Sequence, residues 1–415
     1  MDLLGTHPPT VESRTRRPTA ESIAASDLCA EPMNETTMKQ RSAFRPKIRQ
    51  KHPTNIPVEV YTCGAACAIT QVTAPCDGRD GGDQARLLVD CQVMKAIVIS
   101  RLGGPEALEV RDMPDPVPGP GYESIRVQAG GLNFADVMTT QGGYPGTPKP
   151  PLVAGREFCG VRESDGRRVM GYAQWGAFAE RVSARPELLW PVPESWTVEE
   201  GAAFPVNYFT AYLAYWKAGL TGEPRPTDRT APRVLIHAVA GGVGTAAVQI
   251  GKLLGVEMYG TSSSDEKLAR VKELGLQHGI NYKQRDYEEA VKDLTHGEGV
   301  DVVFEMLGGE HTAKSVRCLR DFGRVIVYGN ATGQKPELDT RVLYAKGASV
   351  HGLWLTYLSA KRELMNQSWK QLSSWTVQGH LHPVIGHMLP MERAVEAYRL
   401  LSEGKNFGKV ILKIT

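Results

Sequence analysis

The sequence contains no apolar run long enough to cross a membrane, because a bilayer span requires roughly 18 or more such residues in succession. It also lacks the apolar core of a secretory signal peptide, and the early acidic residues Asp2, Glu12 and Glu21 argue against a mitochondrial presequence. Neither sign of charge is in excess, since 48 basic and 46 acidic residues leave a net charge of +2. These absences predict a soluble cytoplasmic protein with neither a membrane span nor a nucleic-acid partner.

Cysteine is scarce in the part of the chain that looks most like a folded protein. Of the seven cysteines, only Cys159 and Cys318 lie after residue 93, so no disulfide framework is expected to support the core. Residues 1–93 are rich in Pro, Thr, Ser and Arg and show little apolar periodicity. This composition predicts a disordered tail, or a spurious extension upstream of a true start at Met94. The cysteines within it lack the spacing of paired zinc-binding motifs: Cys29, Cys63, Cys67, Cys76 and Cys91.

A glycine-rich turn between a strand and a helix is the most informative feature of the chain. Residues 234–236 predict a buried strand, the turn at 241–244 follows, and apolar residues at helical spacing continue to Gly255. A second strand at 256–261 completes a β-α-β unit. Glycines in such a turn let the backbone approach a pyrophosphate, and the helix N-terminus offers free N–H groups. The unit predicts a dinucleotide site made by Gly241, Gly242, Val243 and Gly244.

The residues after the second strand discriminate between the two nicotinamide cofactors. An NAD site usually has Asp or Glu there, about 20 residues past the glycines, to bind the ribose 2′-hydroxyl. This chain has Ser262 and Ser263, followed by Lys267, and such hydroxyls with a cation suit a 2′-phosphate. Asp265 is explained more simply as a favourable charge at the start of the next helix. The sequence therefore favours NADPH over NADH, and the alternative for Lys267 is a solvated helical lysine.

Strands and helices are distributed unevenly along the chain. Short strands with Gly and Pro turns continue from Met94 to about Pro193, which predicts a small barrel-like domain. Helical periodicity enters at 198–213, and strands then alternate with helices over 234–350, as in a doubly wound parallel sheet of the α/β class. We expect a barrel-like domain at 94–207, a Rossmann nucleotide-binding domain at 208–346, and an edge strand with a return to the first domain at 347–415.

Several segments in a fixed order carry a family resemblance that covers residues 94–415. They include MKAIVISRLGGPEALEV, GLNFADVMTTQGGYPG, GREFCG, AAFPVNYFTAYLA, HAVAGGVGTAAVQIGKLLG, GRVIVYGNATG and GKNFGKVILKI. Together they resemble the medium-chain dehydrogenase/reductase superfamily. Within it, the chain is most similar to the zinc-independent NADPH:quinone oxidoreductases of the zeta-crystallin-like group, and it leans toward the vesicle-amine-transport-protein-like branch. The resemblance implies a GroES-like catalytic barrel joined to a Rossmann domain that binds NADPH.

The resemblance also implies which residues form the site. Asn133, Asp136 and Tyr144 would line the nicotinamide and substrate pocket beside Phe134, and Tyr144 could donate a hydrogen bond or a proton. Each has a simpler alternative: an Asx turn for Asn133, a helix start for Asp136 and a packing ring for Tyr144. Further cofactor contacts are implied at Tyr212, Tyr282, Gly329, Asn330, Leu353, Trp354, Lys405 and Asn406, and beside them at Asn207, Tyr328, Leu355 and Lys409, with core filling as the alternative for each aromatic ring.

Zinc ligands are missing where the zinc-dependent branch of the superfamily has them. Asn133 stands in the segment of the expected cysteine, and Arg156 precedes Glu157 where a histidine is expected. Without thiolate or imidazole ligands a tetrahedral zinc site cannot be assembled, so no metal is predicted. Arg156 also predicts a more cationic pocket entrance, and Met138 replaces a second tyrosine of the family. The remaining candidates are interpreted as surface histidines: His380, His382 and His387.

The sequence and the resemblance together predict an enzyme that transfers hydride from NADPH to quinones or other conjugated carbonyls without zinc. Two alternatives stay open. One is an enoyl-thioester or alkenal reductase, and the other is a nucleotide-binding scaffold with little turnover. Related proteins commonly pair through the edge strand of the nucleotide sheet, which implies a homodimer that uses residues 349–355.

Overall fold

The structure is a computed structural model that describes residues 50–51, 57–63, 67–72, 92–222 and 231–415. The chain divides into two compact units, and the larger contains Val89–Thr415. In the smaller unit, β1 (Gln50–Lys51) is antiparallel to β2 (Pro57–Cys63), and β3 (Cys67–Val72) completes a three-stranded sheet in the order β1-β2-β3. The prediction that residues 1–93 form a disordered tail or a spurious extension falls largely outside the described residues.

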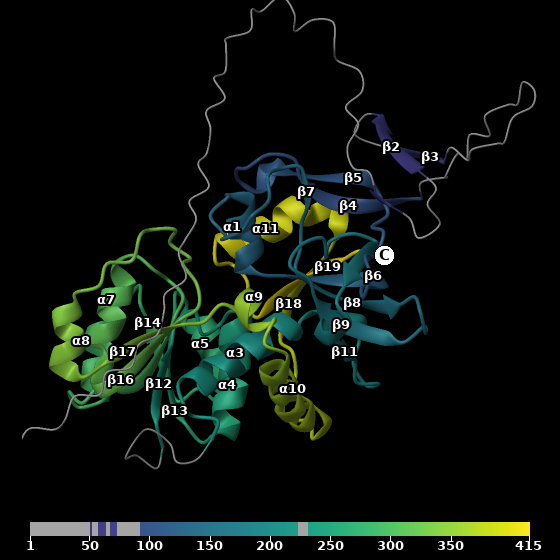
Figure 1. The fold of residues 1–415 in the computed structure, drawn as a ribbon. Helices are drawn as coiled ribbons and strands as arrows, with labels where there is room; N and C mark the ends of the chain where they lie inside the picture. Colours follow the sequence, from purple (N-terminus) through teal and green to yellow (C-terminus); the bar gives the residue numbers. More distant parts are fainter. Residues whose placement is uncertain (1–49, 52–56, 64–66, 73–91, 223–230) are drawn as a thin grey trace, which may run out of the picture. The chain divides into compact units, whose positions relative to one another are not determined.

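Two sheets build the first, β-rich part of the larger unit. The smaller sheet has the order β5-β4-β7, and the larger has the order β11-β9-β8-β6-β19-β18 with β10 also paired to β6. Because β19 is antiparallel to β6, with Val410 opposite Leu132, the chain returns here after the nucleotide-binding part (Figure 1). The strands are β4 (Val93–Ile99), β5 (Leu108–Pro114), β6 (Glu123–Leu132), β7 (Leu152–Val153), β8 (Glu157–Arg162), β9 (Arg168–Tyr172), β10 (Arg181–Ala184), β11 (Leu189–Pro191), β18 (Ile385–Pro390) and β19 (Lys409–Lys413).

Helices of this part are short. The structure corrects the single helix predicted at 198–213, because Pro205 occupies the first turn of a new helix, where its missing N–H costs nothing. The loop between β8 and β9 is short, since only five residues separate Arg162 from Arg168. The helices are α1 (Phe134–Thr140), α2 (Val198–Ala202) and α11 (Ala394–Ser402), with the 3₁₀ turns η3 (Pro105–Ala107), η4 (Pro186–Leu188) and η5 (Met391–Arg393).

A six-stranded parallel sheet forms the second part of the larger unit, in the order β14-β13-β12-β15-β16-β17, where the sequence predicts nucleotide binding. This is the strand order of a Rossmann fold. In that fold the second and third strands lie on one side of the first strand and the fourth to sixth strands lie on its other side, so the order reverses between the first and fourth strands, here β12 and β15. The α/β fold class predicted from the sequence is confirmed. The strands are β12 (Arg233–Ile236), β13 (Glu257–Ser262), β14 (His278–Asn281), β15 (Val300–Glu305), β16 (Leu319–Val327) and β17 (Ser349–Gly352).

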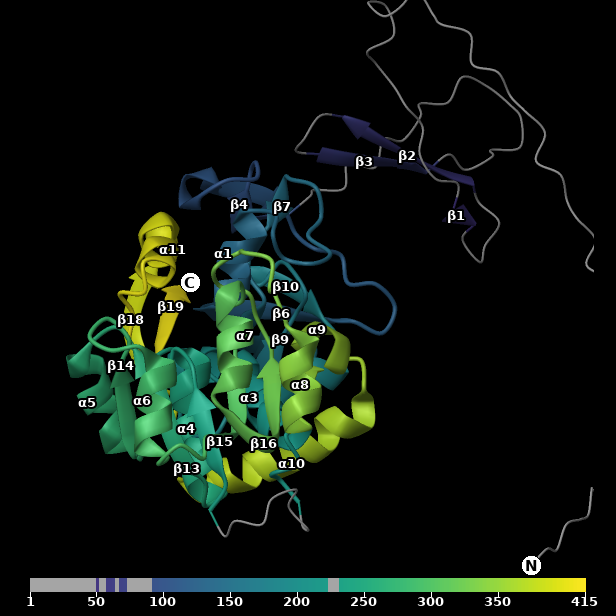
Figure 2. The same cartoon turned by 90° about the vertical axis from the view of Figure 1, so that its left-hand side faces the viewer.

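Helices cover both faces of the parallel sheet (Figures 1 and 2). The strands β12 and β15 are consequently buried along almost their whole length, as their Val- and Ile-rich sequences predict. The predicted domain boundary at 207 falls inside α3, and the division itself stays a prediction. The helices are α3 (Pro205–Lys217), α4 (Gly242–Leu253), α5 (Asp265–Leu274), α6 (Tyr287–Leu294), α7 (Glu310–Arg317), α8 (Thr340–Lys346), α9 (Leu355–Leu358) and α10 (Arg362–Val377). Among the described residues, no helix is both long and apolar enough to span a membrane.

Phe322, within β16, has a left-handed backbone with φ of 61°, and its side chain is 75% exposed. This conformation costs an L-residue about 1–2 kcal/mol, and only glycine adopts it freely. We expect the Phe322→Gly variant to have a free energy of unfolding about 1 kcal/mol higher than that of Phe322→Ala, measured by urea denaturation. The alanine variant is the matched control, because it removes the ring and keeps Cβ. Equal stability of the two variants would contradict backbone strain at this position.

Candidate active site

The glycine turn at residues 241–244 follows β12 and lies at the carboxyl edge of the parallel sheet. The strand order of the sheet reverses beside this strand. Gly241 is the N-cap of α4, and the first helical amides have no acceptor within the helix. A Cβ on Gly242 would lie 2.6 Å from Asn207 Nδ2, and one on Gly244 would overlap the carbonyl oxygen of Val239. Glycine is therefore required at both positions by close packing. The turn offers backbone N–H groups and a helix N-terminus to a bound anion.

The loop after α11 runs beside this turn. The amide of Gly408 donates to the carbonyl oxygen of Ala240 at 2.8 Å, and Gly408 forms an isolated bridge with Gly241. Asn406 is buried and donates to the carbonyl oxygen of Gly408 at 2.9 Å, whereas the exposed Lys405 pairs with Glu403. The loop that carries the predicted residues Lys405 and Asn406 thus meets the turn at Gly408.

The end of β13 carries the hydroxyl and lysine residues predicted to bind a 2′-phosphate. Ser262 is buried at the end of the strand, and the Ser264 hydroxyl caps α5 by accepting from the amide of Lys267 at 3.3 Å. The Lys267 ammonium donates to the carbonyl oxygen of Gly404 at 2.6 Å. Asp265 lies in the first turn of α5 and accepts from Gln284 at 2.6 Å. Ser263 is half-buried next to this cap, and Tyr282 is exposed after β14.

Two further cations lie near Lys267, and the sequence analysis missed them. Partial burial lowers the pKa of Lys267, and the positive charges of Arg270 and Lys283 lower it further, while Glu266 opposes them. Arg270 also stacks on the ring of Phe407 at 3.6 Å, in the loop after α11. Its spacing of three residues from Lys267 on a helix is a signal that could have predicted it.

The ends of β16 and β17 carry the predicted nicotinamide contacts. Gly329 follows β16, and a Cβ there would lie 3.2 Å from the carbonyl oxygen of Met306. The Oδ1 atom of Asn330 is buried without a hydrogen-bond partner among the described residues. Leu353 is buried and Trp354 is 41% exposed after β17. Tyr212 is not brought to the glycine turn, because its ring packs on Trp375 of α10, with the ring centroids 6.0 Å apart.

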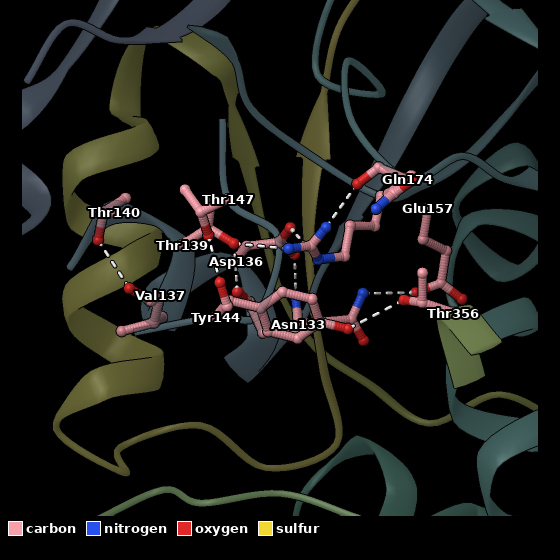
Figure 3. Close-up of polar contacts among 12 residues, drawn as sticks. Asn133, Asp136, Val137, Thr139, Thr140, Tyr144, Thr147, Glu157, Gln174 and Thr356 are labelled. Carbon is pink, nitrogen blue, oxygen red and sulfur yellow. Dashed lines mark hydrogen bonds and ion pairs between the residues drawn. The ribbon is translucent and has the colours of Figure 1, made fainter. Parts of the chain in front are cut away.

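A buried ion pair lies behind the turn in the β-rich part. The Lys409 ammonium contacts Glu157 Oε2 at 2.5 Å and Asn133 Oδ1 at 2.7 Å. Asn133 Nδ2 donates to the same Glu157 oxygen at 3.0 Å (Figure 3). Burial raises the pKa of Glu157, although Lys409 favours its ionised form. The prediction that Lys409 contacts the cofactor is wrong, because its side chain is directed inward and is 2% exposed.

Arg156 is buried between two aromatic rings. Its guanidinium carbon lies 3.9 Å from the centroid of Tyr144 and 4.0 Å from that of Trp175. It donates to Gln174 and Thr139 and lies 3.7 Å from a carboxylate oxygen of Asp136 (Figure 3). The predicted cationic pocket entrance is therefore wrong, because stacking and ion pairing hold this charge inside the domain.

Asp136 supports the start of α1, as its alternative interpretation proposed. Its carboxylate accepts from the backbone amide of Asn133 at 2.9 Å. Asn133 and Asp136 form the capping box of α1, and the Asn133 side chain also bonds to Glu157 and Lys409. Burial raises the pKa of Asp136 to about 6, against the attraction of Arg156. Asn133 and Asp136 are both buried, and their assignment to the nicotinamide and substrate pocket stays a prediction.

The Tyr144 hydroxyl connects the β-rich part to the segment after β17. It accepts from Trp354 Nε1 at 2.8 Å and lies 3.1 Å from Thr356 Oγ1. Tyr172 contacts the same threonine oxygen at 2.7 Å, and burial raises the pKa of Tyr172 to about 12. Tyr144 thus lies directly beside Trp354, which the sequence assigned to the cofactor.

Known proteins are similar to this chain along most of its length. A family model described as zinc-binding dehydrogenase matches residues 242–376. The synaptic vesicle membrane protein VAT-1 homolog of Mus musculus is 35% identical over 347 residues, which cover 77% of this chain and 83% of that protein. The quinone oxidoreductase from Thermus thermophilus, solved alone and with NADPH, is 36% identical with a TM-score of 0.68, covering 77% of this chain and 100% of that one. The JamJ enoyl reductase is 27% identical with a TM-score of 0.68, covering 78% and 99%.

The chain belongs to the medium-chain dehydrogenase/reductase family. Both the VAT-1 homologs and the quinone oxidoreductases are among its relatives, as the resemblance predicted.

Zinc does not fit this member of the medium-chain dehydrogenase/reductase family at the expected position. Asn133 and Arg156 supply an amide and a cation in place of thiolate and imidazole ligands, and Lys409 already neutralises Glu157. His382 pairs with Glu200 at 2.9 Å. No group of three or more His, Cys, Asp or Glu side chains suited to a metal occurs in the part of the chain that the structure describes.

Replacing Lys409 with methionine would leave the Glu157 carboxylate buried without its cation. We expect the free energy of unfolding to fall by about 3–5 kcal/mol, measured by urea denaturation. The double variant Lys409→Met/Glu157→Gln should recover most of this loss, because it removes both charges and keeps similar volumes. A single variant as stable as the double variant would contradict a buried ion pair at this position.

Proposed function

We propose that this chain is an NADPH-dependent oxidoreductase that reduces quinones or other conjugated carbonyls without zinc. The observation that carries the proposal is the glycine turn, in which Gly242 and Gly244 have no room for a Cβ. It is followed by hydroxyls at the end of β13 and by Lys267 in the first turn of α5. Such a turn suits a diphosphate, and the cations near it suit an additional phosphate. The NADPH complex of the Thermus thermophilus relative supports the same cofactor.

Different residues of the chain would bind different parts of such a cofactor. The amides of Gly242 and Val243 would hold the diphosphate at the start of α4, next to Gly241. Ser263 and Lys267 would hold the 2′-phosphate, and Arg270 and Lys283 would add positive charge. Once bound, the cofactor supplies a hydride to the acceptor. The remaining contacts would come from Ser262, Tyr282, Gly329, Asn330, Leu353, Trp354, Lys405 and Asn406.

An aromatic wall in this site favours a planar acceptor. The ring of Tyr144 lies edge-on to Trp175 and Trp354, with centroids 6.2 Å and 6.3 Å away. Such rings pack well on a flat conjugated molecule and exclude water around it. A quinone takes up negative charge on its own carbonyl oxygens, so the protein needs mainly to orient it. The mismatch between zinc and the donor set of Asn133, Arg156 and Glu157 supports a reaction without a Lewis acid.

Enoyl reduction is the second candidate, because it would use the Tyr144 hydroxyl. Hydride addition to a β-carbon requires a proton at the α-carbon, and a tyrosine hydroxyl can supply one. The JamJ relative has this activity in its name. A scaffold with little turnover is the third candidate, since VAT-1 relatives are named for a vesicle membrane. That name also leaves the cytoplasmic location of this chain a prediction.

We also propose that the chain forms a homodimer through β17. This strand is the edge of the parallel sheet, where one row of backbone N–H and C=O groups has no neighbouring strand among the described residues. The position agrees with the segment at 349–355 that the sequence analysis assigned to an interface.

Replacing Lys267 with alanine tests the 2′-phosphate site. We expect the dissociation constant for NADPH to rise about tenfold to a hundredfold, because a charge-assisted contact is lost, while that for NADH stays unchanged. Fluorescence titration with both dinucleotides measures the two constants. Lys272→Ala, on the same helix, is the matched control and should bind both as the wild type does. A parallel loss for NADPH and NADH would overturn the cofactor assignment.

Replacing Tyr144 with phenylalanine separates the two reactions. Quinone reduction should change by less than about threefold, whereas enoyl-thioester reduction should fall by about a hundredfold, because only the latter uses the hydroxyl as a proton donor. Steady-state NADPH oxidation with both acceptor classes measures this. Tyr357→Phe, an exposed tyrosine next to Thr356, is the control. If the wild type binds NADPH and oxidises it with neither acceptor class, the scaffold candidate is favoured instead.

A further inference from the structure

Two backbone segments hold the glycine turn from opposite directions. The first is Val206–Asn207 at the start of α3, where the buried Asn207 amide packs on Gly242 so closely that a Cβ there would lie 2.6 Å from Nδ2. The second is Gly408–Lys409, where the Gly408 amide donates to Ala240 at 2.8 Å and Gly408 bridges Gly241. The turn is thus in contact with parts of the chain about 200 residues apart.

Both segments are attached to the same carboxylate. The amide of Val206 donates to Glu157 Oε1 at 2.6 Å, and the Lys409 ammonium pairs with Glu157 Oε2 at 2.5 Å. Each oxygen therefore holds one of the two segments that contact the turn, and Oε2 also accepts from Asn133. These contacts form a closed series. They lead from Glu157 through Val206 and Asn207 to the glycine turn, and from the turn back to Glu157 through Gly408 and Lys409.

The residues in this series of contacts are closely packed. A Cβ on Gly131 would lie 2.8 Å from Lys409 Cε and 2.9 Å from Glu157 Oε2, so the pair fills its space. Gly408 has a left-handed backbone with φ of 62°, and a Cβ there would overlap the carbonyl oxygen of Val384. The Lys409 amide donates to the same carbonyl at 2.8 Å. A displacement of the lysine side chain would therefore be transmitted to Gly408 and the turn.

We infer that the buried Glu157–Lys409 pair positions the glycine turn for the dinucleotide diphosphate. The inference rests on the proposed function, since it concerns how that cofactor is bound. Glu157 and Lys409 are positioning residues, because neither side chain is directed to the ligand. A backbone site binds tightly only when its amides are already held in place, so loosening one segment should weaken binding.

The test uses the full chain with Lys409→Met/Glu157→Gln. This double variant cuts the Lys409 connection and retains a carbonyl oxygen at position 157 for the amide of Val206. Two probes are titrated: NADPH, which reaches the turn, and adenosine 2′-monophosphate, which carries only the group proposed to bind near Lys267. Hydrogen exchange of residues 238–244 is followed without ligand. The matched control, Lys413→Met/Glu199→Gln, removes another lysine–glutamate pair of β19, with a separation of 3.4 Å.

We expect the double variant to bind NADPH at least tenfold more weakly, to bind adenosine 2′-monophosphate as the wild type does, and to exchange the turn amides faster. The control should match the wild type in all three measurements. Equal weakening of both probes would overturn the inference, because it would indicate general loosening of the nucleotide-binding part. Unchanged NADPH binding and exchange would overturn it while the proposed function stands. Failure of the wild type to bind NADPH would instead overturn the proposed function, and the inference with it.

Discussion

The carboxylate of Glu157 holds together three segments that are far apart in the sequence. It accepts from Asn133 at the start of α1, from the backbone of Val206 at the start of α3, and from Lys409 at the start of β19. A carboxylate with no exposure to water must be fully paired, since removal of one partner leaves an uncompensated charge. The β-rich part, the glycine turn and the returning strand therefore depend on the same group.

Two buried charge pairs lie next to one another in this part of the molecule, and they act differently. Glu157 and Lys409 connect distant segments, whereas Asp136 and Arg156 connect α1 to the aromatic rings around Tyr144. The guanidinium of Arg156 lies over the rings of Tyr144 and Trp175, which are nearly perpendicular to each other, and it donates to Gln174 and Thr139. The face of the Tyr144 ring thus contacts the cation of Arg156, and its hydroxyl accepts a hydrogen bond from Trp354.

Local patterns predicted the features that depend on neighbouring residues. The glycine turn, the start of α5 at Asp265 and the position of Lys267 on that helix all follow from spacings of a few residues, so the sequence sufficed for them. The partner of Lys409 could not be predicted in this way, because Glu157 lies 252 residues away and no local periodicity connects them. Arg156 was expected at the pocket entrance, and its partners Tyr144 and Trp175 come from other segments that only the three-dimensional structure brings to it. Tyr212 stays a predicted cofactor contact: its ring packs on Trp375 of α10 in this structure, whereas Asn207 of the same helix packs on Gly242 of the turn.

The pairing of β19 with β6 has a consequence for how the protein is made. The contact between Asn133 and Lys409 spans 276 residues, and all six parallel strands lie between them in the sequence. On the ribosome, the Rossmann sheet can therefore be complete while the barrel that precedes it still lacks an interior strand and the cation of its buried carboxylate. Because synthesis runs from the N-terminus, the barrel is the first part to begin and the last to be completed. Until then, its unpaired strand edges are a surface that chaperones can bind.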